Sequence, residues 1–361
     1  MNSSTSNKLR VVAIGGGTGL STLLRGLKRY VAAPGAPPQG DRRQRPRTNL
    51  LPDLPCLIRE LSAIVTVTDD GGSSGRLRED LNILPPGDVR NCMVALSEDE
   101  HLLSKLFQYR FTQGDLEGHS FGNLFVAALS GITGDFAEAV QMSSQILATR
   151  GRIYPSTNTS ATLIAEMDDG SLVHGETNIT ASDRSIVELM IEPADSRPLP
   201  ETLAAIAAAD LITLGPGSLY TSVITNLLVR GIPEALAASK ATRVYICNLM
   251  TQANESLGLT ASQHIEKIFN HAGDRIFDYA LINTEPIAAA TRERYALEGQ
   301  SPIHPDLDRI RELGVEPITG NFLHEDDVLR HNYDRVAETL LLLAQQRTFL
   351  PPQQIADPSF A

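Results

Sequence analysis

Short apolar runs alternate along this chain with stretches of helical period. The run at residues 11–14 is followed by glycines and then by leucines at positions 20, 23, 24 and 27, the i, i+3, i+4, i+7 spacing of one helix face. The same order of strand and helix returns at residues 210–229 and 243–273, and a last short run occupies residues 278–283. Because strands that alternate with helices are joined by crossovers, the pattern predicts an α/β fold with a mostly parallel sheet.

One region departs from this alternation. Residues 161–179 contain two β runs around Asp168-Asp169-Gly170, a sequence typical of a hairpin turn. We expect this antiparallel piece to belong to a small β-hairpin lobe at residues 151–200 beside the main sheet. Before the lobe, residues 85–111 have a helical pattern, and Asp88 is the expected N-cap of this helix.

The pattern defines a single domain at residues 10–345, and its last helix is expected to span residues 326–346. We expect the polar N-terminus, residues 1–9, and the proline-containing tail, residues 346–361, to be flexible. Residues 34–55 combine prolines and arginines with few large apolar groups, which predicts a disordered surface insertion. A docking loop for an acidic partner is the alternative for this insertion.

Composition narrows the class of protein. The formal net charge of -12 argues against nucleic-acid binding, which needs a basic surface, although local backbone amides can still hold a small anion. The chain has 3 cysteines and no CxxC pair, which favours a reducing compartment over a disulfide framework. No secretory signal is apparent, and no apolar run approaches the ~20 residues of a membrane helix. We therefore expect a cytoplasmic protein without membrane insertion.

Glycines at the end of the first strand are the first candidate site. The loop consists of Gly15, Gly16, Gly17, Thr18 and Gly19. It lies between a strand and a helix, where backbone amides can approach a phosphate. The dinucleotide fingerprint G-x-G-x-x-G is not met because its last position is Leu20, and no Lys-Ser/Thr pair completes a P-loop. The loop predicts a phosphate cradle without a redox cofactor, and a tight turn is the structural alternative.

The stretch AIVTVTDDGGSSGRLRED, residues 63–80, places two acids and a small-residue loop directly after a core strand. Asp69 and Asp70 reach the same sheet edge as the first loop if the two strands are parallel. Three roles stay open for them: a Mg²⁺ ligand on a diphosphate, with Asp70 as the metal ligand, a general base, or an acceptor for sugar hydroxyls. Capping of the turn is the structural alternative. The residues expected to hold an anion after the acids are Gly72, Ser73 and Ser74.

Further polar residues follow other strands or begin helices. His119 lies just before a helix, where it can contact a phosphate or move a proton, and Asn123 lies in the first turn. Capping of this helix by Ser120 is the structural alternative. Asn248 follows another strand, and Arg330, in the predicted last helix, would supply a cationic contact for a nucleotide. A second glycine loop between strand and helix contributes Gly215, Gly217 and Ser218.

Several of these segments together resemble a known family. The segments are IGGGTGLSTLLRGLK, AIVTVTDDGGSSGRLRED, PPGDVRNCMVALSE, GHSFGNLF, ITGDFAEAV, LGPGSLYTSVITNLLV, VYICNLMTQ and DDVLRHN. In these segments and in their order, the chain resembles the bacterial YvcK gluconeogenesis factors of the wider CofD-like family from Lys8 to Leu343. The insertion and the extended tail depart from the family pattern.

The resemblance implies a Rossmann-like α/β domain with helices on both faces of the sheet. It implies a regulator that binds a UDP-sugar, such as UDP-N-acetylglucosamine, and is needed for cell shape and peptidoglycan synthesis under gluconeogenic growth. The CofD branch implies an alternative, a Mg²⁺-dependent transferase that moves a phospholactyl group from a guanosine diphosphate-activated donor to a deazaflavin. In that case Asp69, Asp70 and His119 are the expected catalytic residues. The other expected partner is a second copy of the chain, in a homodimer.

Overall fold

The structure is a computed structural model that describes residues 8–32, 57–98, 102–326 and 328–349. The insertion predicted at residues 34–55 lies outside the described residues, as do residues 1–7 and 350–361 of the predicted flexible ends. Within the described part of the chain, no helix combines the length and the apolar character needed to cross a bilayer.

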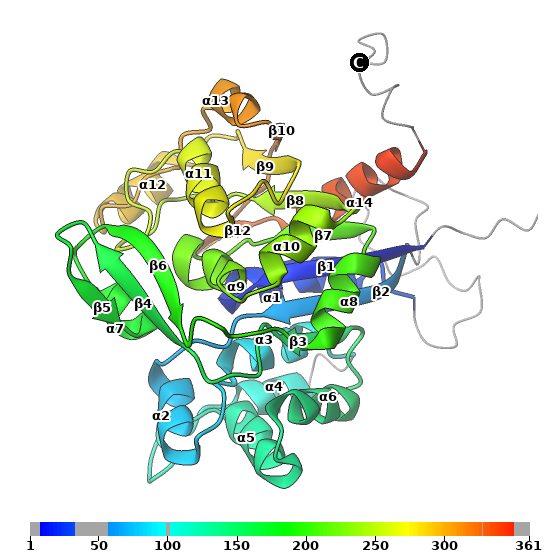
Figure 1. The fold of residues 1–361 in the computed structure, drawn as a ribbon, viewed down its shortest axis with the longest axis vertical. Coiled ribbons are helices and arrows are strands. Elements are labelled where there is room, and N and C mark those ends of the chain that lie inside the picture. Colours follow the sequence, from blue (N-terminus) through cyan, green and yellow to red (C-terminus); the bar gives the residue numbers. More distant parts are fainter. Residues whose placement is uncertain (1–7, 33–56, 99–101, 327, 350–361) are drawn as a thin grey trace, which may run out of the picture.

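A 7-stranded parallel sheet forms the centre of the molecule, with the strand order β10-β9-β8-β7-β1-β2-β3 (Figure 1). Its strands are β1 (Leu9–Gly15), β2 (Ile58–Val65), β3 (Arg152–Pro155), β7 (Leu211–Leu214), β8 (Thr242–Ile246), β9 (Tyr279–Asn283) and β10 (Glu316–Gly320). From β1 the chain moves outward through β2 to β3, and then crosses to the other side of β1 and continues from β7 to β10. The order therefore reverses between β1 and β7, and such a switch point is where open α/β sheets bind ligands. The predicted Rossmann-like, parallel α/β fold is confirmed.

Helices cover both faces of this sheet, as Figure 1 shows. They are α1 (Gly17–Lys28), α2 (Gly72–Leu81), α3 (Gly87–Leu96), α4 (Leu102–Gln108), α5 (Phe121–Thr133), α6 (Phe136–Ile146), α7 (Glu176–Ala181), α8 (Pro200–Ala208), the π-helical turn η1 (Leu219–Ile224), α9 (Thr225–Leu227), α10 (Ile232–Ala238), α11 (Ala261–Ala272), α12 (Ala289–Ala296), α13 (Leu307–Glu312) and α14 (Tyr333–Phe349). Val11 and Ala13 of β1 face a core with α1, α3 and α14, whereas Val12 and Ile14 face a second core with η1, α10 and α11. Successive side chains point to opposite faces, so a strand buried on both faces must be apolar throughout.

Two smaller assemblies flank the sheet. Helices α2, α4, α5 and α6 gather beside β2 and β3, and Ser120 caps α5 by accepting a hydrogen bond from the Asn123 backbone N–H at 3.2 Å (Figure 1). The second assembly is an antiparallel sheet of β4 (Thr162–Met167), β5 (Leu172–His174) and β6 (Ile186–Glu192), in the order β5-β4-β6. The predicted turn at Asp168-Asp169-Gly170 joins β4 to β5, so the hairpin is confirmed. Strand β3, although inside the predicted lobe range 151–200, pairs with β2 in the main sheet.

The end of the chain differs from the sequence pattern. Residues 329–331 form strand β12 (Leu329–His331), which pairs with β11 (Leu323–Glu325), and α14 begins only at Tyr333. The prediction that Arg330 lies in the last helix is therefore wrong. The apolar spacing misled it because Leu329 packs in a small separate core with Leu249 and Ile287 rather than along a helix face. At its other end α14 extends to Phe349, past the predicted boundary at 346.

The loops after β1 and β7 pack directly against each other at the switch point. An added Cβ at Gly19 would lie 2.2 Å from the carbonyl oxygen of Pro216, and one at Gly217 would lie 3.6 Å from the carbonyl oxygen of Gly16. Two backbones approach this closely only where side chains are absent. The absence of a side chain at Gly19 therefore allows this packing, whereas the 3.6 Å contact at Gly217 is an ordinary van der Waals distance.

We predict that Gly19→Ala destabilises the protein by about 1–3 kcal/mol, because the new methyl group must displace the Pro216 backbone. The matched control is Gly131→Ala in α5, where an added Cβ has no neighbour within 4 Å. That change should be neutral or stabilise by up to ~1 kcal/mol, since alanine is the better helix former. Urea unfolding of both variants measures the difference, and an unchanged midpoint for Gly19→Ala would contradict the packing.

Candidate functional site

The strand ends β1, β2 and β7 bring most of the predicted site residues to one edge of the sheet. β1 is paired in parallel with both β2 and β7, so the loops that follow these strands leave in the same direction. Thr18 is exposed in the first turn of α1, and Gly215 begins the neighbouring loop with a φ of 76°. The first-turn amides of α1 have no intrahelical acceptor, as at any helix start, and are therefore available to an anion.

A carboxylate of the protein itself already lies at this helix start. Asp88 Oδ2 accepts a hydrogen bond from the Gly17 backbone N–H at 2.6 Å. Burial of the side chain raises the pKa of Asp88 to about 6, against the lowering effect of the Gly17 bond. The prediction that Asp88 caps its own helix is wrong, because α3 has Pro86 at the N-cap position and Asp88 reaches across to α1 instead.

The two acids after β2 have different partners. Asp69 Oδ1 accepts from the Gly71 N–H at 2.9 Å, which closes a local Asx turn. Asp70 Oδ1 accepts from the backbone N–H and the hydroxyl of Thr177, at 2.8 and 2.6 Å. Asp70 therefore holds the start of α7, and through it the antiparallel lobe, against the end of β2. The second carboxylate oxygen of Asp70, Oδ2, takes no part in these two hydrogen bonds.

Glu176, which the sequence did not single out, lies among these acids. The Thr68 hydroxyl is 3.5 Å from Glu176 Oε2. Burial, together with the nearby charges of Asp69 and Asp88, raises the pKa of Glu176 to about 9. Glu176 is consequently a neutral carboxylic acid at neutral pH. In the sequence, the one sign of Glu176 is that it is an acid in the first turn of a short helix. Such acids are common on protein surfaces, so this pattern does not single it out.

The acids fit a metal only in part. Among the described residues, no group of three His, Cys, Asp or Glu side chains has the geometry to hold an ion. Mg²⁺ on a diphosphate needs only one or two carboxylates, since phosphate oxygens and water supply the other ligands. Within the described part of the chain, Oδ2 of Asp69 and Oδ2 of Asp70 receive no hydrogen bond. Each of these two oxygens therefore lacks a hydrogen-bond donor that would compete with a cation.

A buried polar cluster lies beside the acids. Ser73 Oγ is 3.1 Å from His119 Nδ1, and the Asn123 side-chain amide donates to Ser73 Oγ at 3.1 Å. The Ser73 hydroxyl can either donate to Nδ1 or accept from it, and the imidazole tautomer sets the direction. Burial, with the positive charge of Arg76, lowers the pKa of His119, so its ring is neutral at pH ~7. Among described residues, Asn123 Oδ1 is buried without a partner.

Two further predicted site residues, Gly72 and Ser74, lie at the start of α2; one is exposed to solvent and the other is packed against a neighbouring helix. Gly72 begins α2 with a φ of 49° and is exposed. Ser74 is 4% exposed, and an added Cβ at Gly87 would lie 2.5 Å from Ser74 Oγ. Ser74 therefore packs α2 against the start of α3 and is a less direct candidate than Ser73.

The second glycine loop continues into a chain of side-chain hydrogen bonds. Gln252 donates to Ser218 Oγ at 3.0 Å and accepts from the Asn248 side-chain amide at 3.2 Å. Glu255 accepts from the Tyr220 and Thr221 backbone N–H groups at the start of η1, at 3.0 and 3.4 Å. Thus Ser218 and Asn248, which follow different strands, belong to one connected surface.

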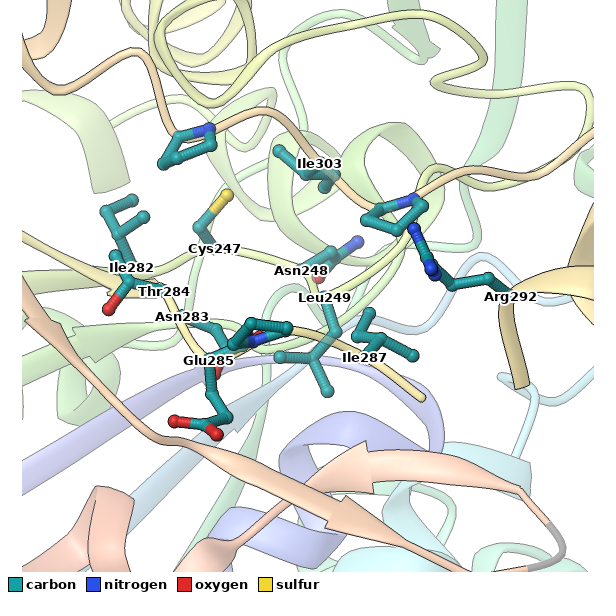
Figure 2. A pocket seen from close by; sticks show the side chains of 13 residues that line it. Cys247, Asn248, Leu249, Ile282, Asn283, Thr284, Glu285, Ile287, Arg292 and Ile303 are labelled. Carbon is teal, nitrogen blue, oxygen red and sulfur yellow. The ribbon is translucent and has the colours of Figure 1, made fainter. Parts of the chain in front are cut away.

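A pocket of about 270 Å³ opens at the ends of β8 and β9 (Figure 2). Asn248 lines it, together with residues that the sequence did not predict, such as Leu249, Ile287 and Arg292. Arg330 is exposed on β12, and the neighbouring His331 donates its Nε2–H to the Cys247 carbonyl oxygen at 3.1 Å. Arg330 therefore lies on the hairpin that adjoins this pocket, separate from the glycine loops in sequence and in strand position.

A parallel sheet whose glycine loops meet at its switch point defines a Rossmann-like α/β protein. The chain belongs to the CofD family: the family model described as 2-phospho-L-lactate transferase CofD matches residues 11–323.

Proteins that match nearly the whole length of this chain are named gluconeogenesis factors. A gluconeogenesis factor from Halalkalibacterium halodurans is 47% identical over 336 residues, which are 92% of this chain and 96% of that protein. The gluconeogenesis factor of Bacillus subtilis is 42% identical over 341 residues, 94% of this chain and 99% of that protein. A crystal structure of a UPF0052 family member from Bacillus halodurans superposes with a TM-score of 0.84 at 47% identity, covering 93% of this chain and 99% of that chain. The resemblance to gluconeogenesis factors is confirmed.

We predict that Glu176→Gln removes a pH-dependent loss of stability. The folded state keeps the Glu176 proton up to a pKa of about 9, whereas the unfolded chain releases it near 4.5. A raised folded pKa means that the wild type loses stability as the pH rises through this window. The melting temperature of Glu176→Gln relative to wild type should therefore climb between about pH 5 and pH 9. Exposed Glu79→Gln on α2 is the control, and parallel pH profiles for all three proteins would contradict the assignment.

Proposed function

We propose that this protein is a regulator that binds a nucleotide sugar, a UDP-sugar such as UDP-N-acetylglucosamine. The regulated process is cell shape and peptidoglycan synthesis during gluconeogenic growth, and the protein acts in the cytoplasm as a homodimer. The gluconeogenesis factor relatives support the link to gluconeogenic growth. The ligand class is supported by the site.

One observation carries this ligand class: the glycine loops after β1 and β7 meet at the switch point, beside the acids that follow β2. Loop and first-turn amides suit the oxygens of a diphosphate. The acids suit hydroxyl groups of a sugar, because a carboxylate is an acceptor. A ligand with a diphosphate in the middle and a sugar at one end therefore matches both halves of the crevice.

Charge adds a requirement for a cation. Asp69, Asp70 and Asp88 lie around the place proposed for a diphosphate, which is itself negative. Like charges in a partly buried site repel strongly, since the effective dielectric constant is low. We propose that Mg²⁺ accompanies the diphosphate and that Asp69 and Asp70 hold it through their Oδ2 atoms. The ion would neutralise the ligand and orient the diphosphate.

We predict that UDP-N-acetylglucosamine binds with one site per chain and more tightly with Mg²⁺ than with EDTA. Isothermal titration calorimetry measures both, with UDP-glucose, GDP and NAD as comparison ligands. At a ligand concentration of 100 times the dissociation constant, the protein should also gain about 2.7 kcal/mol of stability. Binding of NAD with no heat from any UDP-sugar would remove the proposal.

We predict that Asp70→Asn and Asp69→Asn leave the fold intact but weaken UDP-sugar binding in the presence of Mg²⁺. Asparagine keeps the oxygen that caps α7 or closes the turn, so the melting temperature should change little. The loss of a charged ligand should cost about 1.5–3 kcal/mol of binding free energy. Asp168→Asn in the exposed hairpin turn is the matched control. Equal dissociation constants for all four proteins would reduce Asp69 and Asp70 to turn-forming residues.

The alternative is a transferase that acts on a nucleotide-diphosphate-linked donor. Its specific support is the neutral His119 imidazole, which is bonded through Nδ1 to the Ser73 hydroxyl. In the tautomer that carries its proton on Nδ1, Nε2 has a free lone pair that can accept a proton from an acceptor group. The CofD family match supports the same chemistry. Incubation with a guanosine diphosphate-activated phospholactyl donor and a deazaflavin tests it. Release of the nucleoside monophosphate would favour the transferase, and its absence leaves the regulator.

A further inference from the structure

Helix α4 carries apolar side chains on two sides. On its inner side, Leu103 and Phe107 pack against the core, and the Phe107 ring contacts two aromatic rings of α5. On its outer side, Leu102, Leu106 and, just past the helix end, Tyr109 are 74%, 41% and 52% exposed. Positions i, i+4 and i+7 share one helix face, so these three side chains form a continuous stripe. A helix that is apolar all round is normally buried, which indicates that a surface is missing from the outer side of α4.

The loop that follows α4 extends this stripe. The chain leaves Tyr109 and returns to His119, and the two arms are joined by hydrogen bonds. The Phe111 N–H donates to the His119 carbonyl oxygen at 2.9 Å, and the Gly118 N–H donates to the Phe111 carbonyl oxygen at 2.8 Å. Leu116, on the same loop, is a further exposed apolar side chain. The outer surface of residues 102–118, called the α4 face from here on, therefore concentrates four exposed large apolar side chains on one short segment.

Charged side chains of both signs accompany the stripe. Lys105 and Arg110 are the basic residues of the α4 face, Asp115 and Glu117 are its acids, and all four are exposed. Of the ion pairs that the described residues form, none involves these four. Two positive and two negative groups thus lie unpaired around an apolar centre. Such a set is complementary to itself, because each positive group can meet a negative group of an identical face.

We infer that the α4 face docks against the α4 face of a second copy of this chain. The inference rests on the homodimer of the proposed function and assigns a surface to it. A two-fold axis produces a contact in which both copies use the same surface, so that surface must be complementary to itself. The apolar stripe and the balanced charges of the α4 face meet this requirement.

The charge of the whole chain favours this occupant over others. The formal net charge is -12, so two copies repel each other in most orientations. The α4 face is locally neutral, since its two basic and two acidic side chains are its only charged residues. A strongly acidic partner would meet Asp115 and Glu117, and a strongly basic one would meet Lys105 and Arg110. A second copy pairs all four.

The α4 face also adjoins the crevice. Helices α2, α4 and α5 lie together beside β2 and β3 (Figure 1). The Tyr109 carbonyl oxygen accepts from the Phe121 N–H at the start of α5, at 2.8 Å. His119 ends the same loop, and its ring is bonded to Ser73 at the start of α2. A second copy on the α4 face would therefore brace the loop that carries His119.

Leu106→Arg in the full chain tests the apolar stripe. Leu106 lies in the middle of the stripe, and an arginine there would be buried in the contact without a carboxylate. We expect the dissociation constant of the dimer to rise about 25-fold or more, the scale of a central interface residue. Leu172→Arg on β5, where the leucine is also exposed, is the matched control and should associate like the wild type. Sedimentation velocity over a series of protein concentrations measures association, and far-ultraviolet circular dichroism checks the fold.

Two charge variants test whether the face is complementary to itself. Lys105→Glu with Arg110→Glu makes an entirely acidic face. Asp115→Lys with Glu117→Lys makes an entirely basic one. Each variant alone should be monomeric where the wild type is dimeric, because like charges then oppose each other across the axis. An equimolar mixture of the two should restore a dimer, which damage to the fold could not produce.

The outcomes separate this inference from the proposed function. A wild type that stays monomeric at its highest soluble concentration overturns both the docking surface and the homodimer, whereas the UDP-sugar titrations test the ligand independently. A dimer that Leu106→Arg leaves intact overturns the α4 face and keeps the homodimer. Charge variants that are folded and monomeric but form no dimer when mixed overturn the docking of this face on itself.

Discussion

The close approach of Gly19 to the carbonyl oxygen of Pro216 is the constraint on which the site depends. It joins the start of α1 to the loop after β7 across the switch point, where the connection of the chain changes direction. No side chain fits between these backbones, so the crevice has a floor of main-chain atoms. Main-chain atoms therefore form the contact between the two loops, and the Asp88 carboxylate lies beside it on the Gly17 amide. The position of α1 then determines what else can reach the crevice.

Helix starts around the crevice are occupied by the protein's own carboxylates. Asp88 bonds to α1, Asp70 to α7 and Glu255 to η1. Each carboxylate stabilises a positive helix end, as a bound anion would. A phosphate that enters must then share these amides with a carboxylate or replace it. The raised pKa of Asp88, which follows from its burial, makes its protonation the least costly way to reduce this competition near neutral pH.

The parts of this site that follow strands were predictable, and those that depend on distant contacts were not. The alternation of apolar strand segments with helical segments indicates parallel strands and the places of the loops between them. The glycine loops and Asp69 were therefore correctly assigned to one edge of the sheet. The hydrogen bond between Asp88 and Gly17 joins residues 71 positions apart in the sequence, so no pattern of neighbouring residues could predict it. The spacing around Arg330 fits a helix as well as a strand, and only the packing of Leu329 decides between them. The pocket arises from three loops whose sequences have no common period.

Apolar and acidic surfaces divide the sheet edge into two unlike ends. The β8–β9 end is lined mainly by isoleucines and prolines, with the charged side chains of Glu285 and Arg292 among them. The β1–β2 end carries the acids Asp69, Asp70 and Glu176. A ligand that spans both ends would have to be amphipathic along its length, with an apolar group at one end and hydroxyl groups at the other. Neutral Glu176 contributes to this division, because as an acid it can donate to a hydroxyl oxygen while Asp69 and Asp70 accept. Under the proposed function, the two groups that the diphosphate joins, rather than the phosphates, would therefore supply the selectivity of this edge.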